Sequence, residues 1–295
     1  MLEAMITQFL SGLSVVAILV IAALGLAIIF GVAGVINMAH GEFIMVGAYV
    51  AAVVGKLGGN TFAALPAAFI VVGLLGLAIE RGIIRWIYDR PLETLLATWG
   101  VGIALQVIVK LIFGPELYYV GTPKILNGGF RVIGLLPFPY YRAFLIVLAI
   151  LMMVGTFYLL FRTDFGLKVR AVRRNRAMAS CLGIDTARVD MMIFVFGSGL
   201  AGMAGAALAP IKSVSPPMGF SYAVDSYMVL VLGGVGNLLG VVAGSGLIGE
   251  AETILSFIFD NVIGKLLVFL FIVIIIRIVP KGIFGYYERA GRVRG

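Results

Sequence analysis

Residues 24–51 read LGLAIIFGVAGVINMAHGEFIMVGAYVA, and this stretch decides the class of fold. It joins two apolar pieces through a glycine-rich segment that contains the chain's only histidine, His40, and the carboxylic acid Glu42. An ionisable group at membrane depth is costly, and glycine-rich interruptions of apolar runs indicate discontinuous membrane helices. The stretch therefore predicts a broken helix inside a lipid bilayer.

Composition extends this prediction to the whole chain. Of the 295 residues, 62% are hydrophobic and 12% are charged, whereas a soluble domain is about half apolar and about a quarter charged. A membrane helix needs about 20 apolar residues, and the first run is too long for a cleaved signal peptide. The apolar runs cover residues 6–30, 43–54, 62–79, 94–109, 143–161, 191–209, 226–249 and 261–278. We expect an all-α, polytopic transmembrane bundle of eight or nine spans with broken helices, forming one membrane domain over residues 1–295.

A second interruption supports a two-part organisation. Residues 233–237, GGVGN, follow Asp225 and an apolar run, and they end with Asn237. Breaks at corresponding places in two halves indicate discontinuous helices that line a transport pathway. The halves would cover residues 1–113 and 143–279.

Basic residues predict the orientation in the membrane. Lys and Arg gather in residues 162–190 and in the tail after residue 276, and loops rich in these residues stay in the cytoplasm. Alternation then places residues 114–142 and the N-terminus outside and the C-terminus in the cytoplasm, with Lys265 able to reach the membrane surface. The formal net charge of +8 needs no nucleic-acid partner, because the basic residues form no patterned surface.

Small residues recur at a spacing of four, which lets membrane helices approach closely. The repeats are Gly236, Gly240 and Gly244, then Ser198 with Gly202, and Ala201 with Gly205. We expect these helices to pack against each other or against a partner subunit.

Two readings are open for the polar residues at the breaks. His40 and Glu42 either face a cavity or cap a helix start, where the helix dipole favours a carboxylate. Asn37 and Asn237 either bind a polar solute or tie helices together.

The sequence contains none of the common catalytic motifs. One histidine, one cysteine (Cys181) and no HExxH, GxSxG or GxxxxGK[ST] motif exclude a zinc protease, a serine hydrolase and ATP hydrolysis by this chain. No cofactor or metal is expected, and ATP-driven transport would need a separate nucleotide-binding polypeptide.

The predicted cytoplasmic segment contains a candidate docking element. Residues 173–184 read RRNRAMASCLGI, in which Met178 and Leu182 share one helical face and Gly183 is placed to end the helix. A short helix of this kind inserts into a groove on a soluble partner. The alternative is a basic loop that lies on anionic membrane lipid.

Several stretches resemble the branched-chain amino acid permease family of bacterial ABC importers. Residues 24–51 are similar to its N-terminal signature, and residues 166–184, 197–209 and 231–244 are similar to its later signatures. Residues 90–106, RPLETLLATWGVGIALQ, and residues 263–285 resemble the urea-type branch of that family. Nearly the whole chain is covered.

The resemblance implies a multi-pass protein of the bacterial inner membrane with defined partners. These are a second permease subunit, two ATP-binding subunits and a periplasmic solute-binding protein. It also implies that residues 177–183 are a degenerate coupling-loop motif in which Ala177 replaces the usual glutamate. The residues expected to couple to the ATPase are Arg173, Arg176, Ala177, Met178, Ala179, Leu182 and Gly183.

We therefore expect a permease subunit for urea or short-chain amides that works by alternating access. A neutral solute needs a narrow polar lining more than a charge partner. The candidate pathway residues are Asn37, Thr94, Thr98, Gln106 and Asn237, together with His40 and Glu42. The alternatives are a branched-chain amino acid permease of the same family and an ATP-independent urea channel or secondary transporter.

Overall fold

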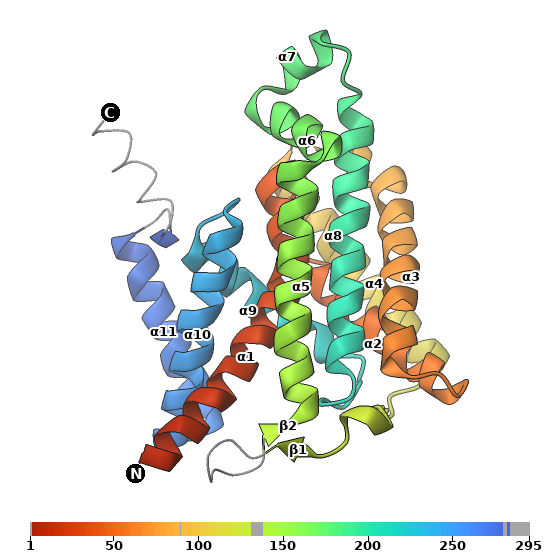
Figure 1. The fold of residues 1–295 in the computed structure, drawn as a ribbon. Coiled ribbons are helices and arrows are strands. Elements are labelled where there is room, and N and C mark those ends of the chain that lie inside the picture. Colours follow the sequence, from red (N-terminus) through yellow and green to blue (C-terminus); the bar gives the residue numbers. More distant parts are fainter. Residues whose placement is uncertain (1, 89, 131–137, 280–281, 284–295) are drawn as a thin grey trace.

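The computed structural model describes residues 2–88, 90–130, 138–279 and 282–283. Within them, helices form a bundle with one pair of very short antiparallel strands at one end (Figure 1). The elements are α1 (Leu2–Ile28), the π-helical turn η1 (Ile29–Ala33), α2 (His40–Lys56), α3 (Thr61–Gly82), η2 (Ile84–Trp86), α4 (Pro91–Phe113), η3 (Lys124–Leu126), β1 (Gly129–Phe130), β2 (Phe138–Pro139), α5 (Tyr140–Arg162), α6 (Asp164–Arg174), α7 (Arg176–Cys181), α8 (Thr186–Leu208), α9 (Met218–Gly233), α10 (Leu238–Ile258) and α11 (Asn261–Ile278).

The helices are a few residues longer than the apolar runs, because capping residues define where the helices begin. Asn60 accepts a hydrogen bond from the backbone N–H of Ala63 and starts α3. Asp185 accepts one from the backbone N–H of Arg188 and starts α8. Such caps satisfy N–H groups that have no partner within the helix.

The helical bundle is confirmed, and six of the described helices are long and apolar enough to cross a membrane. The expected eight or nine spans also counted α2, α9 and α11, which have 17, 16 and 18 residues. At a rise of about 1.5 Å per residue, α9 is only about 24 Å long, less than the ~30 Å hydrocarbon core. Both α2 and α9 adjoin a break in the chain.

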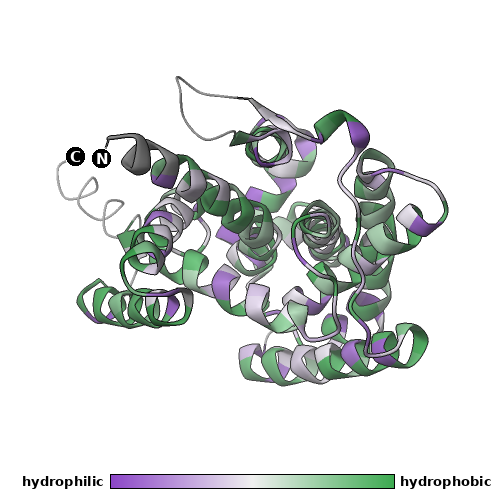
Figure 2. Cartoon of the chain, turned by 90° about the horizontal axis from the view of Figure 1, so that it is seen from below, coloured by the Kyte–Doolittle hydropathy of each residue, from purple (hydrophilic) through white to green (hydrophobic). Residues whose placement is uncertain are grey.

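Helix α8 occupies the centre of the bundle, packed against α1, α2 and α3. Its small residues allow this contact, as the repeat spacing predicted. A Cβ added at Gly202 would lie 2.6 Å from the carbonyl oxygen of Ala68 in α3, and one at Gly205 would lie 2.7 Å from the backbone nitrogen of Ala48 in α2. Large hydrophobic side chains are exposed on the peripheral helices, for example Leu111 in α4, Leu151 in α5 and Leu266 in α11, which suits contact with lipid. Figure 2 colours the chain by hydropathy.

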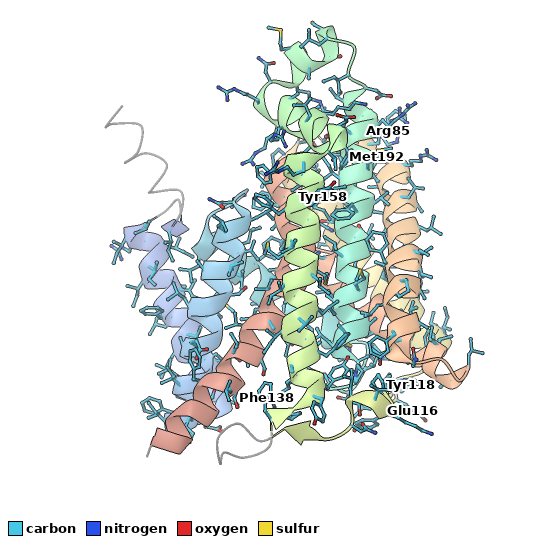
Figure 3. All side chains as sticks on the ribbon, in the orientation of Figure 1. Arg85, Glu116, Tyr118, Phe138, Tyr158 and Met192 are labelled. Atoms are coloured by element: carbon cyan, nitrogen blue, oxygen red, sulfur yellow. The ribbon has the colours of Figure 1, made fainter. Side chains whose placement is uncertain are left out.

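The two ends of the bundle differ in the way that the orientation prediction requires. Helices α6 and α7 lie at one end with Arg85, and the N-terminus lies at the other end with Glu116 and Tyr118 (Figures 1 and 3). Residues 162–190 thus contain two helices of their own. The basic tail beyond residue 283 lies outside the described residues. Which end faces the cytoplasm stays a prediction.

Both predicted breaks are present. The first begins at Gly31 in the π-helical turn η1, passes through Gly34, which has a φ of 70°, and continues until α2 begins at His40. The second lies between α9 and α10, where Gly234 and Gly236 have φ values of 99° and 84°. These angles lie in the left-handed region that glycine adopts without a Cβ clash. Gly236 therefore lies outside the helix, and only Gly240 and Gly244 of its repeat are helical.

Candidate functional site

The first break is fixed on one side by α1. His40 is fully buried, and its Nε2 lies 2.8 Å from the carbonyl oxygen of Ala22, within hydrogen-bond distance. A Cβ added at Gly25 would lie 3.2 Å from the His40 ring, so α1 approaches this side chain closely. His40 stands at the start of α2, as one of its two readings held, but there it ties α2 to α1 and makes no cap bond.

Helix α4 fixes the break on the other side. The hydroxyl of Thr98 accepts a hydrogen bond from the backbone N–H of Met38 at 3.0 Å and lies 3.2 Å from the carbonyl oxygen of Ile36. Thr94 donates to the carbonyl oxygen of Pro91 within α4. Both threonines are fully buried in the interior of the bundle.

Asn37 lies within the first break, and its side chain is fully buried. Among the described residues, neither polar atom of its side chain has a hydrogen-bond partner. A buried amide without a partner is expensive, and such groups often serve a solute, an ion or a water molecule.

Glu42 occupies a slot between α4 and α9. A Cβ added at Gly219 would lie 2.7 Å from its Oε2, and one added at Gly102 would lie 3.4 Å from its Cγ. Two glycines therefore make room for this carboxylate. The side chain is buried, and its Oε2 has no hydrogen-bond partner among the described residues.

A cavity of about 760 Å³ lies in front of Glu42, between α4, α9 and α11. Gln106 also lines it and donates a hydrogen bond from Nε2 to the carbonyl oxygen of Pro216. Most of the wall is apolar, with polar groups from Ser221 and Tyr227. Of the seven predicted pathway residues, Glu42 and Gln106 line this cavity. The other five do not: Asn37, His40, Thr94 and Thr98 lie in or beside the first break, and Asn237 lies in the second.

Asn237 caps α10 by accepting a hydrogen bond from the backbone N–H of Leu239. This cap lies within α10, so it is neither the tie between helices nor the solute contact that the sequence left open. The second break also contacts the first, because a Cβ added at Gly31 would lie 2.7 Å from the Cα of Gly236.

Sequence reasoning missed a charged cluster at the N-terminal end of the bundle. Lys265 pairs with Asp225 at 2.9 Å. A cavity of about 820 Å³ beside it is lined by Arg142, Lys212 and Glu252. The only sequence signal was Asp225 and Lys265 within apolar runs, since charges at membrane depth usually pair.

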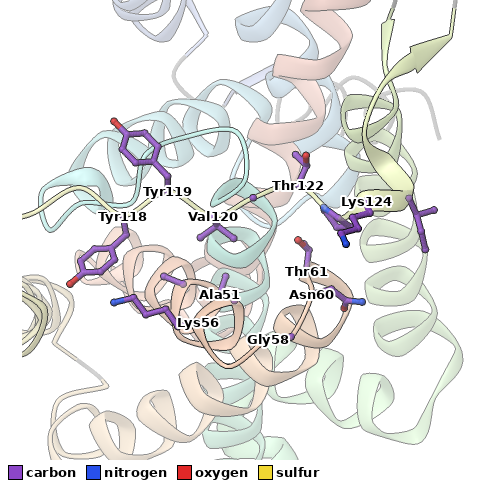
Figure 4. Close-up of a pocket in the computed structure, with 16 residues that line it drawn as sticks. Ala51, Lys56, Gly58, Asn60, Thr61, Tyr118, Tyr119, Val120, Thr122 and Lys124 are labelled. Carbon is purple, nitrogen blue, oxygen red and sulfur yellow. The ribbon is translucent and has the colours of Figure 1, made fainter.

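A further cavity of about 610 Å³ lies at the same end, between the turn that joins α2 to α3 and the segment after α4 (Figure 4). The ammonium of Lys56 lies 4.2 Å from the centre of the Tyr118 ring, a cation–π contact that closes one side. Asn60 and Lys124 also line this cavity.

At the opposite end, α7 presents apolar side chains to the solvent. Met178 and Leu182 are 58% and 74% exposed, as the docking prediction requires, and Ala177 is exposed as well. Ala179 is buried against the bundle. Gly183 has a φ of 80° directly after the helix, so its predicted role in ending α7 is confirmed.

Arg176 anchors α7 to the bundle. Its Nη2 lies 2.5 Å from the Oδ2 of Asp190, whose side chain is buried in α8. Its guanidinium also lies 5.7 Å from the Tyr88 ring centre, and Tyr88 donates a hydrogen bond to Glu80. Burial, together with the nearby Glu80 and Asp190, raises the pKa of Tyr88, so this phenol remains a proton donor. Arg176 is therefore an anchor, a role that sequence spacing did not reveal.

Comparison with known protein families identifies the family of this chain. The model of the permease component of branched-chain amino acid transport systems matches residues 8–277. The chain belongs to the branched-chain amino acid permease family. This permease is a transport subunit and not an enzyme, and it is a multi-pass protein of the inner membrane.

Curated relatives match this permease over nearly its whole length. It is 29% identical to the high-affinity branched-chain amino acid transport system permease protein LivH of Salmonella typhimurium, over 95% of this chain and 96% of the relative. It is 28% identical to BraD of Pseudomonas aeruginosa with the same coverage. LivM of Escherichia coli is 24% identical over 76% of this chain and 58% of its own. No solved structure gives a significant match.

These names support the wider family rather than its urea-type branch. The family was predicted correctly from residues 24–51 and the later signatures, and the predicted branch rests on residues 90–106 and 263–285 alone.

Gly183 offers a first test of the coupling element in this permease. No atom lies within 4 Å of a Cβ added there, but its positive φ costs a non-glycine residue about 1–2 kcal/mol, and more if the residue is β-branched. We expect Gly183→Val to lower solute uptake per ATP hydrolysed at least about fivefold, because the end of α7 is displaced. The melting temperature in detergent should not change. Gly183→Asn, which tolerates this backbone region, is the control, and normal coupling in Gly183→Val would contradict the assignment.

Proposed function

We propose that this chain is the membrane-spanning subunit of an ATP-driven importer for branched-chain amino acids. The observation that carries the proposal is the match to LivH and BraD, named as permeases for these solutes, over 95% of the chain. The chain alone has no nucleotide-binding motif, so the work must come from partner subunits.

The partners in this proposal are a second permease subunit, two ATP-binding subunits and a periplasmic solute-binding protein. Similarity to both LivH and LivM supports a partner permease of related sequence. The exposed Met178 and Leu182 on α7 form an apolar face of the kind that inserts into a groove of an ATP-binding subunit. In the proposed orientation that end is cytoplasmic, and the binding protein docks at the opposite end.

The cavity between α4, α9 and α11 is the proposed solute site. The carboxylate of Glu42 is available to an ammonium group, because one of its oxygens has no partner among the described residues. Ile103, Met228 and Ile272 supply an apolar wall for an aliphatic side chain. A mostly apolar pocket with few polar groups is the usual form of a small-molecule site.

Urea or a short-chain amide is the second candidate solute. Residues 90–106, which supply Trp99, Ile103 and Gln106 to the cavity, carry the resemblance to the urea-type branch. No Lys or Arg is among the described residues that line this cavity, so the carboxylate of an amino acid finds no cation there. A neutral solute rich in N–H donors needs only acceptors such as Glu42 and Gln106.

Uptake in cells that carry the complete transporter tests both the class and the solute. With the ATP-binding subunits present, labelled leucine or labelled urea should accumulate, and unlabelled excess of the true solute should abolish that uptake. Deletion of the ATP-binding subunits should reduce accumulation to the background of cells without the permease. Uptake that survives the deletion would show that the protein is a channel or a secondary transporter and not an ATP-driven importer.

A further inference from the structure

Arg173, on the last turn of α6, contacts the place where the two helix breaks meet. Its Nη1 donates a hydrogen bond to the carbonyl oxygen of Gly236, 3.1 Å away. Gly236 in turn packs directly on Gly31 of η1. One cationic side chain therefore contacts the second break directly and the first break through a single backbone contact.

Two helix C-termini lie within three residues of the contact between Gly31 and Gly236. The helix formed by α1 and η1 ends at Ala33, and α9 ends at Gly233. The last carbonyl groups of a helix have no donors within it, and each C-terminus carries about half a negative elementary charge. Two such ends repel each other, and a guanidinium near them reduces this repulsion. The hydrogen bond itself goes to the carbonyl oxygen of Gly236, in the loop between α9 and α10.

Helix α6 connects this contact to α7. Val169 and Val172 are buried, so α6 is seated on the bundle. Asn175 accepts a hydrogen bond from the backbone N–H of Met178 and thereby caps α7, while its own N–H donates to the carbonyl oxygen of Ala171. Only two residues separate Arg173 from the start of α7, so a displacement of α7 reaches Arg173 through one short link.

We infer that Arg173 is a positioning residue that transmits movement of α6 and α7 to both helix breaks. This inference rests on the proposed function, because it assumes that an ATP-binding subunit moves α7. In the conformation described here, the hydrogen bond to Gly236 holds the breaks together. Displacement of α6 withdraws the guanidinium and lets the breaks separate beside the cavity. The family resemblance had placed Arg173 among the residues that couple to the ATPase.

The test uses the complete transporter in liposomes with three variants of this chain. Arg173→Gln should lower solute uptake per ATP hydrolysed about tenfold, since it removes a hydrogen bond from a charged donor. Arg173→Lys keeps the charge without the planar fork and should lose about threefold. Arg174→Gln, which removes the same charge from the exposed neighbouring residue, is the matched control and should couple normally.

A labelling experiment measures directly how accessible the second break is. Val235 lies in the second break and is 46% exposed. In a Cys181→Ser background, Val235→Cys should react with a thiol reagent at a basal rate that reflects this partial exposure, and the rate should rise when ATP and solute are added. With Arg173→Gln it should react about tenfold faster from the start, whereas Arg174→Gln should change nothing.

Three outcomes separate the possible failures. Loss of the ATP-binding subunits from the purified Arg173→Gln complex would assign Arg173 to the docking surface and overturn the inference. Normal coupling and normal labelling in both Arg173 variants would overturn it as well. A transporter with Arg173 intact that accumulates neither leucine nor urea with ATP would instead refute the proposed function.

Discussion

Gly205→Val in α8 is expected to abolish stable folding of this permease. A Cβ at residue 205 would overlap the carbonyl oxygen of Ile44 and lie 2.7 Å from the backbone nitrogen of Ala48. These are backbone atoms of α2, so no change of rotamer relieves the overlap. Overpacking of a core costs about 1–3 kcal/mol and occasionally more, and a contact between two backbones belongs to the upper end of this range.

The effect is measured as the melting temperature and the monodisperse fraction of the detergent-solubilised protein. Gly155→Val is the matched control, because Gly155 is also inside a membrane helix and no atom lies within 4 Å of an added Cβ. It should retain normal yield and a nearly normal melting temperature. Equal behaviour of the two variants would mean that α2 and α8 do not pack as described.

Glu42→Gln is expected to produce the largest loss of transport among substitutions that leave the fold intact. The amide keeps the shape of the carboxylate in the slot between Gly102 and Gly219, so packing is preserved. A hydrogen bond between charged groups contributes about 1.5–3 kcal/mol. For a solute with an ammonium group, uptake at low concentration should therefore fall at least about tenfold.

The same variant separates the two candidate solutes. Urea carries no charge, and the amide oxygen of glutamine still accepts its N–H groups, so urea uptake should fall less than about threefold. Glu93→Gln is the control, because this acid is exposed and pairs with Arg90 at the start of α4. The measurement is the initial rate of uptake of labelled leucine and of labelled urea in each variant. Unchanged rates for both solutes would place the route elsewhere.

Much of the fold was predictable because membrane helices are defined locally. The apolar runs 62–79 and 143–161 lie within α3 and α5, and both glycine-rich breaks are present. Local sequence also indicated the helix end at Gly183. Local sequence did not decide the number of spans, because α2 and α9 are short helices beside breaks.

The site was predictable only in part. Glu42 and Gln106 line a cavity, whereas His40 bonds to Ala22 and Thr98 holds the backbone at Met38. Spacing along a helix tells which residues share a face, and it does not tell what that face contacts. Polar residues near a break are therefore easy to find and hard to divide into solute contacts and supports.

The sequence by itself determined that this chain is a helical membrane protein with two breaks, and which family it belongs to. Hydrophobic run length and glycine content specify the spans and the breaks, because the bilayer demands an apolar surface and internally satisfied backbone groups at every span. The family follows instead from the resemblance of residues 24–51 and the later signatures. Only the tertiary structure decided that the two breaks touch at Gly31 and Gly236, that Arg173 contacts them, and that Arg176 pairs with Asp190. These pairs are distant in sequence or set by helix packing, and packing depends on all the helices at once.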